Sequence, residues 1–232
     1  MDTDYKKLVE FWNQSFVISH DDKKNMKDAI KTENDWKDLA PSSKLFDVLI
    51  SFKDLDNVLD YGAGSGWASI IMAKSGVKHI DAVDVAKNSI EMIKFYSEIF
   101  EESDKIKPIL IDETWLGKQD SNKYDGLFCS NVLDVIPYDM AKDIVKQCAR
   151  IVKKGAKVIF SFNYYIDPKA MEQKGFSVSD SYIYINGILR LNSIDEVGWT
   201  NLFKKYFQVE KIDYFAWPGE EKETRRLFVL RK

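Results

Sequence analysis

The residues with the clearest chemical potential lie in one short stretch, 58–67, which reads V-L-D-Y-G-A-G-S-G-W. An apolar run ends at Asp60, and glycines follow at every second position, Gly62, Gly64 and Gly66. Glycine permits positive φ angles and lets a ligand approach bare backbone. A helix start then offers free N–H groups to an electronegative ligand. The stretch therefore predicts a strand, a ligand-binding turn and a helix, although a turn that needs small residues only for packing is the alternative.

Polar residues follow at the ends of the next expected strands. Asp84 ends an apolar segment 18 residues after the last of these glycines, and its two oxygens match the vicinal diol of a ribose. Asp112 and Glu113 end the following strand, where an acceptor can bind an adenine amino group. Ser130 and Asn131 end the fourth strand. Because open α/β sheets bind ligands at the carboxyl ends of their strands, these residues predict a nucleoside site.

Strand and helix signals alternate from residue 45 onward, which predicts a parallel sheet covered by helices on both faces. The strands expected from this alternation are 57–60, 79–84, 106–111, 124–130 and 156–162. In the tail, Asn186-Gly187 predicts a hairpin over 182–191, a helix follows over 193–206, and strands 207–215 and 225–230 can pair antiparallel at the sheet edge. Residues 1–44 show only helical spacing, so we expect a helical cap there and an α/β domain over 45–232.

Composition narrows the functional classes. The 34 basic and 37 acidic residues are interspersed and give a net charge of −3, which argues against a nucleic-acid partner. Cys129 and Cys148 lie in apolar patterns, and neither histidine has a partner at metal-ligand spacing, so we expect reduced thiols and no metal. No signal-like segment and no apolar run of ~20 residues is present, so we expect a cytoplasmic protein without a membrane anchor. The oligomeric state stays open.

The ordered blocks resemble the motifs of class I S-adenosylmethionine-dependent methyltransferases. They are the glycine stretch 58–67, D-A-V-D-V-A at 81–86, I-L-I-D-E-T at 109–114, Y-D-G-L-F-C-S-N-V-L-D-V-I-P at 124–137, and I-V-K-K-G-A-K-V-I-F-S at 151–161. The likeness covers roughly residues 45–165, with a weaker likeness in the tail. It implies a three-layer, Rossmann-like α/β sandwich. Its seven-stranded sheet would be mostly parallel with an antiparallel last strand, and S-adenosylmethionine would be the cofactor.

The resemblance also implies which residues hold the cofactor. They are Asp60, Gly62, Ala63, Gly64, Gly66, Asp84, Val85, Asp112, Glu113, Ser130 and Asn131. Asp60 would lie near the methionine ammonium, and Asp84 would bind the ribose hydroxyls. Val85 would pack on the adenine, and Asp112 would meet its amino group.

A nicotinamide dinucleotide is the competing cofactor. Its fingerprint, G-x-G-x-x-G, has a third glycine where this chain carries Trp67. A bulky side chain at that position opposes close packing of helix and strand. The dinucleotide also leaves the blocks at 109–114 and 124–137 unexplained, so S-adenosylmethionine is the better prediction.

Methyl transfer from a sulfonium is a direct displacement that needs alignment and a dry pocket. An alcohol or amide acceptor also needs a base, for which Asp134, Tyr138 and Asp139 are weak candidates; a loop carboxylate or helix cap is the alternative for the two aspartates. We expect the acceptor pocket between the cap and an insertion at 163–191. Its candidate wall residues are Trp12, Phe16, Trp36, Tyr138, Asn163, Tyr164, Tyr165 and Trp217, with packing of the aromatics onto the core as the alternative.

The sequence therefore predicts an enzyme that methylates a small molecule. Two alternatives remain: a protein or peptide acceptor, and a cofactor-binding subunit without activity. No residue pattern identifies the acceptor atom.

Overall fold

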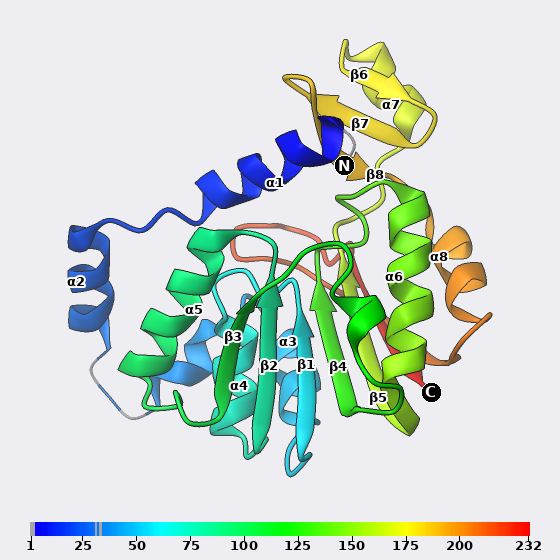
Figure 1. Ribbon diagram of the computed structural model, residues 1–232. Helices are drawn as coiled ribbons and strands as arrows, with labels where there is room; N and C mark the ends of the chain where they lie inside the picture. Colours follow the sequence, from blue (N-terminus) through cyan, green and yellow to red (C-terminus); the bar gives the residue numbers. More distant parts are fainter. Residues whose placement is uncertain (1–2, 31, 33) are drawn as a thin grey trace.

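The computed structural model describes residues 3–30, 32 and 34–232. Within them, one seven-stranded sheet has the order β3-β2-β1-β4-β5-β10-β9 (Figure 1). Its strands are β1 (Asn57–Tyr61), β2 (His79–Asp84), β3 (Ile106–Leu110), β4 (Tyr124–Ser130), β5 (Val152–Phe162), β9 (Gln208–Phe215) and β10 (Arg225–Arg231). The first five pair in parallel, whereas β10 runs antiparallel to both β5 and β9. The predicted mostly parallel sheet with an antiparallel last strand is confirmed.

Neighbouring residues of each strand point to opposite faces of the sheet, so the chain builds two cores. Val58 and Phe128 pack against α3 (Ser43–Ile50), α4 (Trp67–Lys74) and α5 (Lys87–Ile99). Leu59 and Leu127 pack on the other face against α6 (Tyr138–Ile151) and α8 (Glu196–Phe203). This alternation follows from the period of two of a strand. The three-layer sandwich results from it directly.

The cap and the insertion lie outside this alternation. The cap contains α1 (Thr3–Ser15), α2 (His20–Ala29) and the 3-10 helix η1 (Asp35–Leu39). The insertion contains α7 (Pro168–Gln173) and a separate antiparallel sheet of β6 (Ser177–Ser179), β7 (Tyr182–Ile185) and β8 (Ile188–Asn192). Asn186 and Gly187 have φ angles of 53° and 71°, as a tight hairpin turn requires. Figure 1 shows α1 running above the carboxyl edge of the main sheet toward β8.

Several boundaries differ from expectation for local reasons. The strand expected from residue 156 begins at Val152, directly after α6. The helix expected over 193–206 spans only Glu196–Phe203, because the Asp195 side chain accepts the Gly198 N–H at 2.8 Å and caps it. The short elements β6, α7 and η2 (Leu116–Lys118) carried too few residues to show a period.

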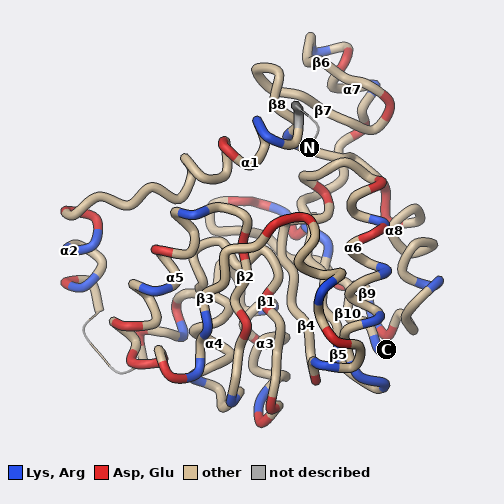
Figure 2. The backbone as a smooth tube through the Cα atoms, in the orientation of Figure 1, with Lys and Arg blue, Asp and Glu red and all other residues tan. Residues whose placement is uncertain are grey.

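Charged residues are spread along the described part of the chain. Figure 2 shows basic and acidic segments interspersed over both the sheet and its helices. In the described ranges, no helix has the length and apolar character needed to cross a bilayer.

Gly126 of β4 offers a test of core packing between the sheet and the turn that follows α3. A Cβ at this position would lie 2.6 Å and 2.7 Å from ring carbons of Phe52 and 3.0 Å from Leu55. Gly126→Ala should therefore lower the free energy of unfolding by ~1–3 kcal/mol, measured by urea denaturation. Gly117→Ala is the matched control, because nothing lies within 4 Å of its added Cβ. Equal stability of the two variants would contradict this packing.

Candidate functional site

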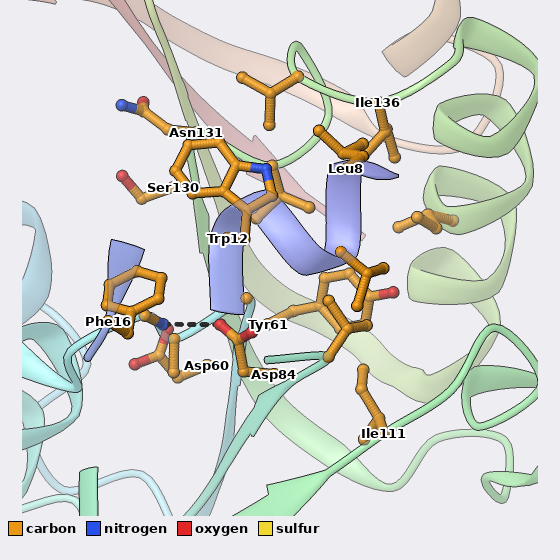
Figure 3. A pocket seen from close by; sticks show the side chains of 18 of the residues that line it. Leu8, Trp12, Phe16, Asp60, Tyr61, Asp84, Ile111, Ser130, Asn131 and Ile136 are labelled. Atoms are coloured by element: carbon orange, nitrogen blue, oxygen red, sulfur yellow. Dashed lines mark hydrogen bonds between the residues drawn. The ribbon is translucent and has the colours of Figure 1, made fainter. Parts of the chain in front are cut away.

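A cavity of about 560 Å³ lies at the carboxyl ends of β1, β2, β3 and β4 (Figure 3). The turn after β1 and the other strand ends form its polar floor. Apolar walls come from α1, the loop after β4, the first turns of α6 and the loop before β10. The volume falls in the range of ~300–1,000 Å³ that small-molecule sites occupy.

The glycine turn after β1 is held to β2 by backbone hydrogen bonds. The N–H groups of Gly62 and Ala63 both donate to the Val83 carbonyl, at 2.9 and 3.0 Å. Gly62 has a φ of +71°, and a Cβ there would lie 2.2 Å from Cγ2 of Val132. The turn therefore needs glycine at this position both for its conformation and for its close approach to the loop after β4.

The Asp84 carboxylate fixes the same turn from the end of β2. One oxygen accepts the Gly64 N–H at 2.9 Å, and the other accepts the Ala86 N–H at 2.8 Å. The side chain is buried, and burial raises the pKa of Asp84 against the lowering effect of these hydrogen bonds. Each carboxylate oxygen has a second lone pair, so both can still accept a ligand hydroxyl.

Asp60 lies below the turn and is fully enclosed. Its carboxylate accepts the Ser69 hydroxyl at 2.6 Å. Burial raises the pKa of Asp60 to about 7, because no cation compensates the charge among the described residues around it. A ligand ammonium at this end of the cavity would supply that compensation.

Asn131 adds an unused acceptor. Its backbone has a φ of +54° and its N–H donates to Ser161 at 2.9 Å. The side-chain Oδ1 is buried and has no hydrogen-bond partner among the described residues. Since buried polar atoms are normally paired, this oxygen fits a donor group on a ligand. Together with Asp60 and Asp84, it matches the ammonium and ribose of S-adenosylmethionine.

The third strand end supplies further acidic groups. Asp112 accepts hydrogen bonds from the Thr114 N–H and hydroxyl, at 2.9 and 2.6 Å, which lower the pKa of Asp112. Glu113 and Val85 also line the cavity. From α1, Tyr5 faces this group; burial, with the nearby carboxylates of Glu113, Asp84 and Asp112, raises the pKa of its hydroxyl.

Helix α1 is attached at two places. Near its end, Asn13 accepts the Asn88 N–H at 3.0 Å and its carbonyl accepts the Asn88 side-chain amide at 2.9 Å. Two residues earlier in the helix, the Phe11 ring centroid lies 4.0 Å from the Arg190 guanidinium of β8. A Cβ added to Gly64 of the glycine turn would lie 3.1 Å from the Phe16 ring. Phe16, which directly follows α1, thus lies over the glycine turn.

The cavity brings together almost all residues predicted to hold the cofactor. Those that line it are Asp60, Gly62, Ala63, Gly64, Asp84, Val85, Asp112, Glu113, Ser130 and Asn131. Gly66 does not; it precedes α4 with a φ of +83° and packs against Ile93 of α5. Its role is therefore to start the helix.

The expected acceptor wall needs correction. Trp12, Phe16 and Trp217 line the cavity, whereas Trp36 does not. Trp36 packs instead on Phe46, with ring centroids 5.8 Å apart, against α3.

The start of the insertion also lies outside the cavity. The Asn163 N–H and side-chain amide donate to the Asp134 carboxylate at 2.7 and 3.0 Å. Tyr164 and Tyr165 line a separate hollow that includes Tyr214. The insertion therefore supports α1 through β8 and does not line the cavity itself.

None of the three candidate bases lines the cavity either. Asp134 is fully buried, burial raises its pKa, and its carboxylate orients Asn163. Asp139 points to solvent and pairs with Lys142 at 2.6 Å. The Tyr138 ring packs edge-on against Trp199, with centroids 5.7 Å apart.

Several lining residues escaped the sequence analysis. They are Tyr5, Leu8 and Val9 of α1, Ile111, Val132, Val135 and Ile136 of the strand-end loops, and Met140, Asp143 and Ile144 of α6. Helical spacing offered a signal, because residues 5, 8, 9 and 12 share one face of α1 and Phe16 follows that helix. Among the residues described, no group of three or more acidic, histidine or cysteine side chains could hold a metal ion.

The raised pKa of Asp60 leads us to expect that the free energy of unfolding depends on pH in an unusual direction. An unfolded aspartate has a pKa of about 3.9. Since the folded pKa is about 7, the folded state keeps a proton that the unfolded state has lost between these values. The free energy of unfolding should therefore decrease as pH rises from ~4 to ~7. Asp60→Asn, which keeps an acceptor for Ser69, should lose this part of the dependence in urea titrations at several pH values; identical profiles would contradict the assignment.

Comparison with known proteins identifies the family. A family model described as a methyltransferase domain matches residues 21–179, well over half of the chain. Ubiquinone biosynthesis O-methyltransferase of Alkalilimnicola ehrlichii is 31% identical over 104 residues, which are 45% of this chain and 40% of that protein. Ribosomal protein L11 methyltransferase of Ruminiclostridium cellulolyticum is 30% identical over 112 residues, which are 44% of this chain and 34% of that protein. The chain thus matches two-fifths or less of the length of these two relatives.

Solved structures agree on the fold. Magnesium protoporphyrin IX methyltransferase from Synechocystis PCC 6803 with bound SAH superposes with a TM-score of 0.66 and 15% identity, covering 99% of this chain and 100% of that one. An S-adenosylmethionine-dependent methyltransferase from Mesorhizobium loti gives 0.64 and 14%, covering 84% and 100%. At this identity the likeness shows the fold alone. With the family match, it confirms the predicted class and cofactor: the chain belongs to the methyltransferase-domain family of class I S-adenosylmethionine-dependent proteins.

Proposed function

We propose that this chain transfers a methyl group from S-adenosylmethionine to a small, largely apolar acceptor. One observation carries the proposal: a single cavity joins the polar floor at the strand ends to an apolar wall. The floor matches a nucleoside with an amino-acid tail, and the apolar wall would exclude water from the adjoining space once an acceptor is bound. Direct displacement needs this combination of alignment and dryness.

The floor residues would divide the cofactor between them. Asp84 would accept the ribose hydroxyls, and Asp112 would accept from the adenine amino group. Asp60 and the unpaired Oδ1 of Asn131 would face the methionine ammonium. The bound cofactor supplies the electrophilic methyl group, and these side chains fix its orientation.

The wall residues would receive the acceptor. Trp12, Val132 and Trp217 present apolar surface to the cavity. Beside the proposed cofactor residues, the one described acidic side chain that lines it is Asp143 of α6, which is exposed at the rim. An acceptor hydroxyl near α6 could pass its proton to this carboxylate, a role that the buried Asp134 cannot take.

Asp84 tests the cofactor site. Asp84→Asn keeps the size of the side chain but replaces one acceptor oxygen by a donor, so S-adenosylhomocysteine should bind roughly 10- to 100-fold more weakly in titration calorimetry. Asp139→Asn is the matched control, since this carboxylate pairs only with Lys142 in the described structure and lies off the cavity. Equal affinities of the two variants would remove the assigned role.

Transfer of labelled methyl groups tests the acceptor class. The protein should label molecules in a low-molecular-mass cell extract when S-adenosylmethionine carries a tritiated methyl group. Label in the protein fraction alone would instead support a protein acceptor, the activity named for the L11 methyltransferase relative. Binding of S-adenosylhomocysteine without transfer to either fraction would indicate a cofactor-binding subunit.

A further inference from the structure

Trp217 lies in the loop between β9 and β10 and lines the cavity with a side chain that is 39% exposed. A small hydrogen-bonded turn closes this loop. The Trp217 N–H donates to the Glu220 carboxylate at 2.9 Å, and the Glu220 N–H donates to the Trp217 carbonyl at 3.0 Å. The indole therefore extends from a loop that two hydrogen bonds between Trp217 and Glu220 hold closed.

Arg225, which does not line the cavity, lies against the indole. Its guanidinium carbon lies 3.9 Å from the Trp217 ring centroid, a close cation–π contact. The Nε and Nη2 atoms donate to Glu220 at 2.8 and 2.7 Å, and Nη1 donates to Asn163 Oδ1 at 2.6 Å. Asn163 is itself held by the buried Asp134. Arg225 is only 7% exposed. A chain of hydrogen bonds runs from Asp134, in the loop after β4, through Asn163, Arg225 and Glu220 to the backbone N–H of Trp217.

Trp12 of α1 also lines the cavity and has an arginine farther from its ring. The Arg190 guanidinium of β8 lies 4.0 Å from the Phe11 ring and 6.0 Å from the Trp12 ring. Of these two indoles, Trp217 therefore has the close arginine contact.

We propose that Arg225 is a positioning residue that holds Trp217 as a stacking platform, and that the acceptor is a planar aromatic or conjugated ring. The proposal rests on the proposed function and names the substrate class of that site. A fixed indole face favours a flat ring over an aliphatic group of equal size, because aromatic stacking adds to simple burial. The hydrogen bonds of Arg225 keep that face from turning away when the cavity fills.

The test compares two probes of similar size on the protein saturated with S-adenosylhomocysteine. These are 2-naphthol, which is planar, and decahydro-2-naphthol, which is not. Titration calorimetry should show ~2- to 10-fold tighter binding of 2-naphthol to the wild type. Trp217→Phe should keep a preference for 2-naphthol, and Trp217→Leu should reduce the ratio to about one. Arg225→Met and Glu220→Gln should lower the ratio while the affinity for S-adenosylhomocysteine stays unchanged.

Arg231→Met is the control for loss of an arginine on the same strand, because Arg231 pairs with Glu210 on the neighbouring strand β9. A wild type that binds both probes equally would overturn the stacking platform. An undiminished ratio in Arg225→Met or Glu220→Gln would overturn the positioning role, and if Arg225→Met does not fold, Glu220→Gln decides. Failure of the wild type to bind S-adenosylhomocysteine would overturn the proposed function itself, a result that the probe ratio does not mimic.

Discussion

The carboxylate of Asp84 joins three pieces of backbone on which the cavity depends. It ends β2, binds the N–H of Gly64 in the glycine turn, and binds the N–H of Ala86 just before α5. A buried carboxylate is unfavourable unless hydrogen bonds compensate it, and unpaired N–H groups at a turn or helix start are unfavourable as well. The hydrogen bonds between the carboxylate and these N–H groups therefore compensate for the burial of both. The Ser89 hydroxyl adds a bond to the Gly64 carbonyl, so α5 is tied to the same point.

The ligand floor follows from this arrangement. With the turn held over the end of β2, the cavity extends between Asp60 below and the loop after β4 on the far side. Val132 of that loop fits against Gly62 so closely that no side chain is possible there. The reversal of strand order between β1 and β4 leaves the space that the ligand needs.

Most residues predicted for the floor line one cavity, whereas several predicted for the walls do not, and the reason is physical. Strand ends fall at one edge of a parallel sheet, so Asp84, Asp112 and Asn131 had to converge once the strands were recognised. An aromatic residue in a cap or loop carries no such constraint. Trp36 packs behind α3 and Tyr164 lies over another hollow, because tertiary packing sets the rotation of a helix and the path of a loop. Asp143 escaped notice for the same reason.

The segment that the family model matches begins at residue 21 and ends at residue 179. Helix α1 and the loop that carries Trp217 both lie outside it, although both form walls of the cavity. The matched segment holds the floor, where Asp84 and the glycine turn constrain each other, and also the walls formed by the loop after β4 and by α6. Helix α1 and the loop that carries Trp217 form the other walls, and they do not take part in the hydrogen bonds of Asp84. On the proposed function, the acceptor can therefore change through these two segments while the residues proposed to hold S-adenosylmethionine stay in place.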